Sequence, residues 1–220
     1  MFQFTDRDIL LISNQSLIVS SNSEKNILLL FSILNNEISK KILEINLKLE
    51  NETNYLVPIK SIKQYIRMPI ITKSNEFIKN DIINKTKKLL SLENIYMKDI
   101  VDFSNVSMQK FSDVYLYKNY LTLKYDNDKD IKLHVKNNKL NIVQQSIENN
   151  LKDIKNISLN EIKMLKVIDY KKRDELKNYI DHLIFLLYFN IDTKSDIINN
   201  FIKLKKLCAK SKFYGYIFGK

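Results

Sequence analysis

Lysines interleaved with aromatic rings are the residues of this sequence whose types and spacing point to a chemistry. The chain has 220 residues, with 36 Lys and Arg against 25 Asp and Glu and a formal net charge of +11. No acidic residue follows Asp196, whereas lysines continue to the end. Lysines neutralise phosphates with release of counterions, and aromatic rings stack on unpaired bases. We therefore expect nucleic acid to be bound by Lys203, Lys205, Lys206, Lys210, Lys212, Tyr214 and Tyr216.

A second basic segment covers residues 59–90, which contain 8 Lys and Arg but only 2 Asp and Glu. Three of its basic residues, Lys60, Lys63 and Arg67, are spaced so that they would share one face of a helix. One interpretation is that these basic residues contact successive phosphates of a nucleic-acid backbone. The other is that they form an ordinary solvated helix face. The same choice applies to the tail, whose aromatic residues could instead pack against a sheet. The candidate residues here are Lys60, Lys63, Arg67, Lys85, Lys87 and Lys88.

Glycine, cysteine and histidine are too scarce for most catalytic motifs. Gly215 and Gly219 are the only glycines, which excludes glycine-dependent phosphate loops and the nucleophile elbow of α/β-hydrolases. Cys208 is the only cysteine, so no internal disulfide can form. It is also far in sequence from His134 and His182, and the three do not make a zinc motif. We expect no catalytic residue, no metal site and no cofactor, and we interpret the chain as a protein that is not an enzyme.

The composition indicates a strongly AT-biased genome. Lys, Ile and Asn, whose codons are AT-rich, are abundant, while Ala, Gly and Pro are scarce. An organelle, a virus or phage, a plasmid or a reduced parasite is the expected source. Part of the lysine content then reflects mutational drift, so the charge is most informative where it is concentrated locally.

Neither a secretory signal nor a membrane span is predicted. Charged residues interrupt the first ten positions, where a signal would need an apolar run. The longest apolar stretches, Ile27–Leu34 and Leu183–Phe189, are shorter than the roughly 18–20 residues that cross a bilayer. We expect a soluble protein of an intracellular, reducing compartment or an organelle matrix, which is not secreted and has no membrane partner.

The first part of the chain is expected to contain a hairpin, a helix and a strand. Apolar runs on both sides of Asn14 predict the hairpin. Apolar residues at three- and four-residue steps over residues 27–42, after a Ser21-x-x-Glu24 capping box, predict one helix. Alternation of apolar and polar residues over 43–49 then predicts a half-buried strand.

Two helical pieces and a β-meander are expected to follow. A short return strand at 55–57 would end at Pro58, and the pieces within 59–90 should be separated at Pro69, since the residue before a proline is pushed out of the helical region. Residues 97–106 favour a further helix. Four strands joined by short polar turns are predicted at 113–118, 120–126, 130–135 and 139–143.

Helices are expected again from about residue 146. Ser158-x-x-Glu161 should open one helix, and an apolar stripe from Leu176 to Leu187 marks the next. A third should be capped at Thr193 and run to Ala209, and residues 213–218 look like a terminal strand. The predicted fold class is α+β, with an N-terminal hairpin/helix/strand unit, a central antiparallel β-meander and C-terminal helices with a terminal strand. The predicted parts, which could all belong to one domain, are 1–90, 91–145 and 146–220.

The functional hypothesis is a non-catalytic, nucleic-acid-associated subunit of a large assembly. RNA is favoured over DNA, so the assembly would be a ribosome-type or other ribonucleoprotein particle with further protein subunits. One alternative is a viral or phage accessory protein of DNA replication or transcription. Another is a protein–protein interaction module whose lysines bind an acidic partner.

Overall fold

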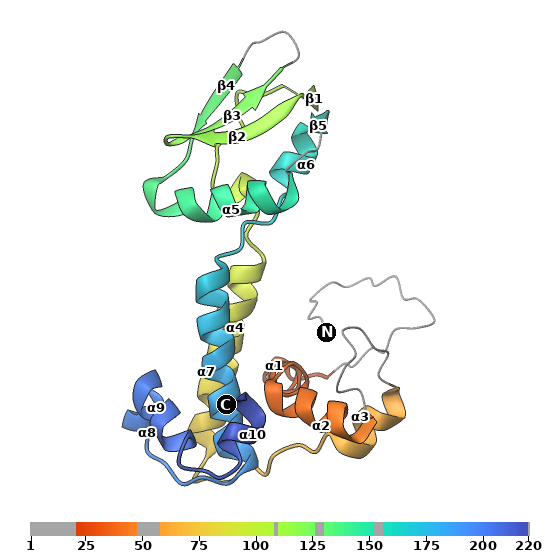
Figure 1. Ribbon diagram of the computed structural model, residues 1–220, viewed down its shortest axis with the longest axis vertical. Helices are drawn as coiled ribbons and strands as arrows, with labels where there is room; N and C mark the ends of the chain where they lie inside the picture. The colour runs from red at the N-terminus through yellow and green to blue at the C-terminus, as the bar shows by residue number, and fades with distance from the viewer. Residues whose placement is uncertain (1–20, 48–57, 108–109, 126–129, 152–155, 220) are drawn as a thin grey trace. The chain divides into compact units, whose positions relative to one another are not determined.

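The computed structural model describes residues 21–47, 58–107, 110–125, 130–151 and 156–219. It contains helices and small antiparallel sheets, so the fold class is α+β, as the sequence predicts (Figure 1). The chain forms two compact units: unit 1 comprises residues 1–89 and 175–220, and unit 2 comprises residues 90–174. That the parts 1–90, 91–145 and 146–220 are separate stays a prediction.

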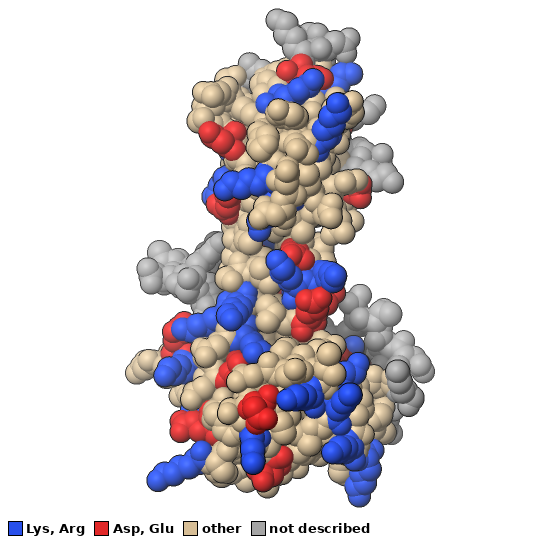
Figure 2. Space-filling view, turned by 90° about the vertical axis from the view of Figure 1, so that its left-hand side faces the viewer, with Lys and Arg blue, Asp and Glu red and all other residues tan. Residues whose placement is uncertain are grey.

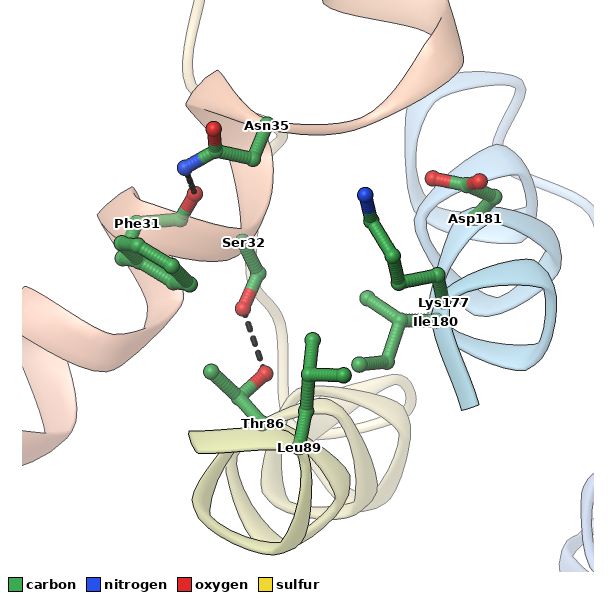
Figure 3. A pocket seen from close by; sticks show the side chains of 8 residues that line it. All are labelled: Phe31, Ser32, Asn35, Thr86, Leu89, Lys177, Ile180 and Asp181. Atoms are coloured by element: carbon green, nitrogen blue, oxygen red, sulfur yellow. Dashed lines mark hydrogen bonds between the residues drawn. The ribbon is translucent and has the colours of Figure 1, made fainter. Parts of the chain in front are cut away.

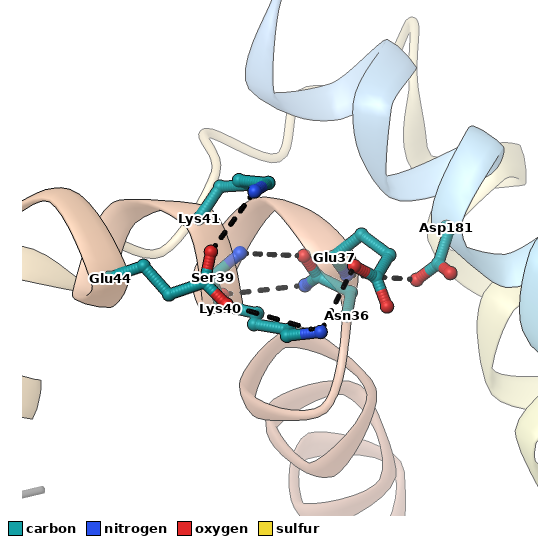
Figure 4. Close-up of polar contacts among 7 residues, drawn as sticks. All are labelled: Asn36, Glu37, Ser39, Lys40, Lys41, Glu44 and Asp181. Atoms are coloured by element: carbon teal, nitrogen blue, oxygen red, sulfur yellow. Dashed lines mark hydrogen bonds and ion pairs between the residues drawn. The ribbon is translucent and has the colours of Figure 1, made fainter. Parts of the chain in front are cut away.

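Two helices, α1 (Glu24–Leu34) and α2 (Glu37–Leu47), occupy the region where a single helix was predicted. The prediction is wrong because Asn36, which is 2% exposed, interrupts the helix with its own side chain. Its amide donates to the carbonyl of Ile33 and its oxygen accepts from the Ser39 N–H at 2.9 Å (Figure 4). The capping box was also misplaced, since Ser23 caps α1 by accepting from the Asn26 N–H at 3.4 Å.

The strand predicted over residues 43–49 is wrong for residues 43–47, because α2 continues to Leu47. Residues 48 and 49 lie outside the described residues. Its alternating pattern also fits a helix, in which Ile38 and Leu43 are buried while Ile45 is 40% exposed. The predicted hairpin around Asn14 and the return strand at 55–57 lie outside the described residues.

The break between the next two helices is confirmed. Helix α3 (Ile59–Tyr65) begins directly after Pro58, and α4 (Glu76–Glu93) begins well after Pro69. Both prolines lie outside the helices, where their missing N–H and fixed φ cost nothing.

Helix α7 (Tyr170–Tyr188), predicted from its apolar stripe, is confirmed and lies beside α4 within unit 1 (Figure 1). Near its C-terminal end the burial extends around the whole helix, over Ile180 and residues 182–187. A helix that is buried on every side lies at the centre of its unit. The rest of unit 1 is therefore built around α7.

The C-terminal segment contains short helices and no strand among the described residues, which contradicts two predictions. The helix expected from Thr193 to Ala209 is two helices, α8 (Ser195–Ile198) and α9 (Phe201–Cys208). Asn200 caps α9 by accepting from the N–H groups of the two residues that follow Phe201, at 3.1 Å each. The terminal strand is instead a short helix, α10 (Tyr214–Phe218).

In unit 2, three of the four predicted meander strands are confirmed as one antiparallel sheet. The strands are β2 (Asp113–Tyr117), β3 (Tyr120–Lys124) and β4 (Asp130–His134). The register pairs Tyr117 with Tyr120 and Tyr120 with His134. The fourth strand is wrong, since the segment 139–143 enters helix α5 (Leu140–Asn150). Its apolar residues fit a helical period equally well, and Val143 and Ile147 are buried in α5.

The other elements of unit 2 are short. The helix predicted at 97–106 is only a 3-10 turn, η1 (Met97–Asp99). Strands β1 (Lys110–Phe111) and β5 (Ile157–Ser158) pair antiparallel, and α6 (Leu159–Lys163) follows directly. The Ser158–Glu161 capping box that was predicted to open α6 is confirmed. The core of unit 2 lies between α5 and one face of the sheet, with Phe111, Leu121, Leu123 and Val143 almost fully buried.

Among the described residues, no helix combines the length and the apolar character that crossing a membrane would require.

Candidate nucleic-acid interface

Helix α9 carries the lysines of the predicted tail site, and its apolar side attaches it to α7. Leu204 and Cys208 are fully buried, and Phe201 packs against the Tyr179 ring at 5.0 Å between centroids. These contacts involve positions 201, 204 and 208 of α9, which lie on one side of a helix. The lysines at the other positions are therefore turned to the outside.

Five lysines within ten residues are exposed on and after α9. None of them forms an ion pair with an acidic side chain in the part of the chain that the structure describes. Lys203, Lys206 and Lys210 follow one another at helical spacing and make one edge of this group. We call the group the α9 surface; its lysines are Lys203, Lys205, Lys206, Lys210 and Lys212.

The α9 surface is bounded by acidic side chains on one side. Helix α8, which precedes it, carries the exposed Asp196. Figure 2 presents the side of unit 1 that bears α8 and α9, and it shows blue side chains in several groups with red ones between them. The lysines thus form a basic patch of limited extent, without a large field of single sign around it.

Most tail aromatics pack inward, as the alternative interpretation of the sequence supposed, although against helices in place of a sheet. Tyr214 donates its hydroxyl to His182 Nε2 at 3.0 Å, and Phe218 stacks on the His182 ring at 4.5 Å. Phe213 stacks on Phe189 at 4.9 Å. Tyr216 is different: it is 64% exposed, and it lies on α10, which packs against α2.

His182 is the centre of this aromatic cluster and is neutral. Its Nδ1 lies 2.7 Å from the Asn178 carbonyl, which can only accept, so Nδ1 carries the proton and Nε2 accepts from Tyr214. Burial lowers the pKa of His182, and the nearby Lys205 charge lowers the pKa further. The periodicity of α7 alone could not show which groups surround His182.

The α3 part of the second basic segment does not join the α9 surface. Lys60 and Lys63 are exposed on α3, which Figure 1 shows on the opposite side of α7 from α9. Arg67 lies past the end of α3 at Tyr65, so the expected three-residue helix face is reduced to two residues. Its backbone carbonyl accepts from the Tyr188 hydroxyl at 2.7 Å.

The candidate lysines of α4 differ in their contacts with the rest of unit 1. Lys85 is paired with Asp81 at 2.8 Å and lies over the Tyr179 ring at 4.2 Å from its centroid, so it is an internal contact of unit 1. Lys87 is exposed and pairs with Glu24 at 2.9 Å. Lys88 is exposed on the same helix.

The structure brings the only cysteine next to a histidine, but in an arrangement unsuited to nucleophilic catalysis. The Cys208 Sγ lies 3.6 Å from the backbone carbonyl of His182, whose two ring nitrogens are both bonded to other groups. Burial raises the pKa of the Cys208 thiol to about 12. A cysteine nucleophile needs a lowered pKa and a free imidazole beside it, and this pair has neither.

A small cavity in unit 1 is also unsuited to an organic ligand. It has a volume of about 20 Å³, room for about one water molecule, and is lined by α1, α4 and α7 (Figure 3). Ser32 and Thr86 are among its lining residues and are hydrogen-bonded to each other, with their hydroxyl oxygens 2.6 Å apart. Among the described residues, no cluster of His, Cys, Asp and Glu could hold a metal ion.

Comparison of the chain with protein-family models, with curated proteins and with solved structures gives no match. The α9 surface and the rest of the structure are therefore the basis of the proposed function.

Proposed function

We propose that this chain is a non-catalytic RNA-binding subunit that holds a phosphate backbone on the α9 surface. The observation that carries the proposal is the set of five exposed lysines at 203–212, whose charges are not neutralised by ion pairs among the described residues. Each lysine that contacts a phosphate releases a condensed counterion. This release is the main source of affinity when binding does not depend on the nucleotide sequence.

RNA is proposed over duplex DNA because an exposed ring follows these lysines closely in the sequence. Tyr216 is 64% exposed and follows Lys212 by four positions. An exposed ring can stack on an unpaired base, which loops of structured RNA offer and a regular duplex does not. The proposed setting is a ribonucleoprotein particle with other protein subunits.

The experiment measures the salt dependence of binding between the full chain and a fluorescent RNA stem-loop by anisotropy. If five lysines contact the RNA, the logarithm of the association constant should fall against the logarithm of salt concentration with a slope of about −3.5 to −4.5. Replacing Lys203, Lys206 and Lys210 by glutamate should reduce the slope by about 2 to 3. Lys205 is left in place because its charge acts on His182.

A matched control changes the net charge by the same amount elsewhere. The triple replacement Lys25→Glu, Lys166→Glu and Lys171→Glu alters exposed lysines outside both basic segments, so its slope should stay close to that of the unchanged protein. Equal losses in the two triple variants would mean that only net charge matters, and the α9 surface would not be a site. Stronger competition by duplex DNA than by structured RNA would overturn the choice of RNA.

A further inference from the structure

The open face of the three-stranded sheet in unit 2 carries a second group of aromatic and basic side chains. Opposite residues of antiparallel strands share a face, so the register places Tyr117, Tyr120 and His134 in one row across the strands. The neighbouring row consists of Tyr115, Thr122 and Lys132. We call these two rows the sheet face.

Among the described residues of unit 2, the side chains of the sheet face are largely exposed. The opposite face of the same strands packs on α5, with Val114, Leu121 and Leu123 almost fully buried (Figure 1). By contrast, Tyr115, Tyr117 and Tyr120 are 36%, 56% and 42% exposed. Large apolar rings that gather on an exposed surface mark interaction sites more often than single exposed residues do.

The rings are arranged at one end of the sheet. Tyr120 and His134 meet edge to face at 5.8 Å between centroids, and the Lys118 ammonium lies 5.5 Å from the Tyr117 ring centroid. The two-residue turn Lys118–Asn119 closes this end, and Lys118 has a φ of 53° there. The short turn keeps the two tyrosines on adjacent strands directly opposite each other.

The charges on the sheet face are separated along the strands. Lys118, Lys132 and Lys136 are exposed around the ring row, and none of them forms an ion pair within the described residues. The carboxylates Asp113 and Asp130 lie at the far end of the strands, in register with Lys124 between them. The end with the rings therefore combines π-faces with positive charge, which matches the bases and phosphates of a single strand.

One buried polar group on this face also lacks a partner. Thr122 is 1% exposed between Tyr115 and Lys132, and its hydroxyl has no hydrogen-bond partner among the described residues. A base edge that displaced one of the flanking side chains would give this hydroxyl a bond, which the folded chain alone does not provide.

We propose that the sheet face binds single-stranded nucleic acid, with unpaired bases stacked on Tyr117 and Tyr120 and phosphates near Lys118, Lys132 and Lys136. This site deepens the proposed function, since it rests on nucleic acid as the ligand, but it lies in unit 2 and uses none of the lysines of the α9 surface. Stacking makes it tolerant of sequence, because every base has a π-face.

A tryptophan probe tests the contact directly, because the chain contains no Trp. In the variant Tyr117→Trp, added oligo(U) of twelve nucleotides should quench the tryptophan fluorescence as bases stack on the ring. Ile45→Trp, at a 40% exposed position on α2, is the matched control and should show no quenching. Oligo(dT) of the same length shows whether DNA single strands are bound as well as RNA.

Affinity measurements on the full chain test how much stacking on the two tyrosine rings contributes to binding. Tyr117→Ala and Tyr120→Ala should each weaken oligo(U) binding by about 5- to 100-fold, while Tyr117→Phe and Tyr120→Phe keep the ring and should stay within about twofold. The salt slope should hardly change in the alanine variants, because no phosphate contact is lost. The phenylalanine and tryptophan variants keep the test valid even where an alanine variant is unstable.

The outcomes separate this inference from the proposed function. Binding that depends on Lys203, Lys206 and Lys210 without quenching at position 117 would overturn the sheet face and leave the α9 surface standing. Quenching at position 117 with unchanged binding in the lysine variants would support the sheet face and overturn the α9 surface. No binding of either oligonucleotide to the unchanged protein would overturn both.

Discussion

Asp181 should make the stability of unit 1 depend on pH in a way that one substitution removes. It lies on α7, and its Oδ1 accepts the N–H of Glu37 at 3.3 Å, at the start of α2 (Figure 4). Burial raises the pKa of Asp181 from 3.8 to about 7, the Glu37 carboxylate adds to the rise, and the N–H bond and Lys177 oppose it. Between about pH 4 and pH 7, the folded protein therefore holds a proton on this carboxyl that the unfolded chain has released.

The magnitude follows from this difference in pKa. One pKa unit corresponds to about 1.4 kcal/mol, so ionising Asp181 in the folded state costs up to about 4 kcal/mol relative to the unfolded chain. Because the folded pKa is the higher one, the stability is fully present below pH 3.8 and is lost as the pH rises toward 7. The loss should amount to about 2 kcal/mol near pH 5.5 and should be complete above pH 7.

The substitution Asp181→Asn keeps an oxygen that can accept the Glu37 N–H but cannot ionise. Urea unfolding from pH 4 to pH 8 should show the two proteins nearly equal at pH 4. At pH 8 the variant should be more stable by up to about 4 kcal/mol. The control is Asp192→Asn, which neutralises an exposed carboxylate and should give no difference that grows with pH. A variant less stable than the parent at pH 8 would refute this reasoning, since Asp181 would then be a favourable anion in the folded state.

Three further predictions concern buried groups. Cys208 is fully buried, and its thiol pKa is raised to about 12. In a series of urea concentrations at pH 8, the rate at which a thiol reagent labels Cys208 should therefore not exceed the rate at which the protein unfolds. Labelling at the rate of a free thiol in the folded protein would contradict the packing of α9. Thr86→Val should lower the free energy of unfolding by about 0.5–1.5 kcal/mol, because it removes the hydroxyl contact at 2.6 Å while Ser32 keeps its bond to the Leu28 carbonyl at 2.8 Å. Thr122→Val should instead be neutral or stabilising in urea unfolding, because the Thr122 hydroxyl has no partner among the described residues to lose.

Long or repeated periodic patterns in the sequence were sufficient for α7 and for the strands that carry the sheet face. The apolar stripe of α7 belongs to a helix of 19 residues, and the alternation of β2, β3 and β4 recurs in three successive segments joined by short polar segments. The capping box of α6 could also be predicted, because its two residues, Ser158 and Glu161, are three positions apart in the sequence. These elements are determined mainly by interactions between residues close in sequence.

Short patterns were not sufficient, because two structures satisfied them equally well. Residues 43–47 alternate like a strand but continue α2, and the tail at 214–218 is a helix, α10, because its aromatic side chains pack on α7. The break at Asn36 was missed for a different reason. Asparagine is common in this chain, and only its burial against the ends of α1 and α2 distinguishes this one.

The sequence alone determined how charge is distributed along the chain, and thereby which segments could bind a polyanion. Only the tertiary structure decided that α3 and α9 lie on opposite sides of α7, that Lys85 and Tyr214 serve the packing of unit 1, and that three strands present tyrosines on one face. The physical reason is that a surface is made by residues distant in sequence. Their proximity depends on how helices and strands pack, and this packing cannot be inferred from the spacing of lysines or aromatic residues along the sequence.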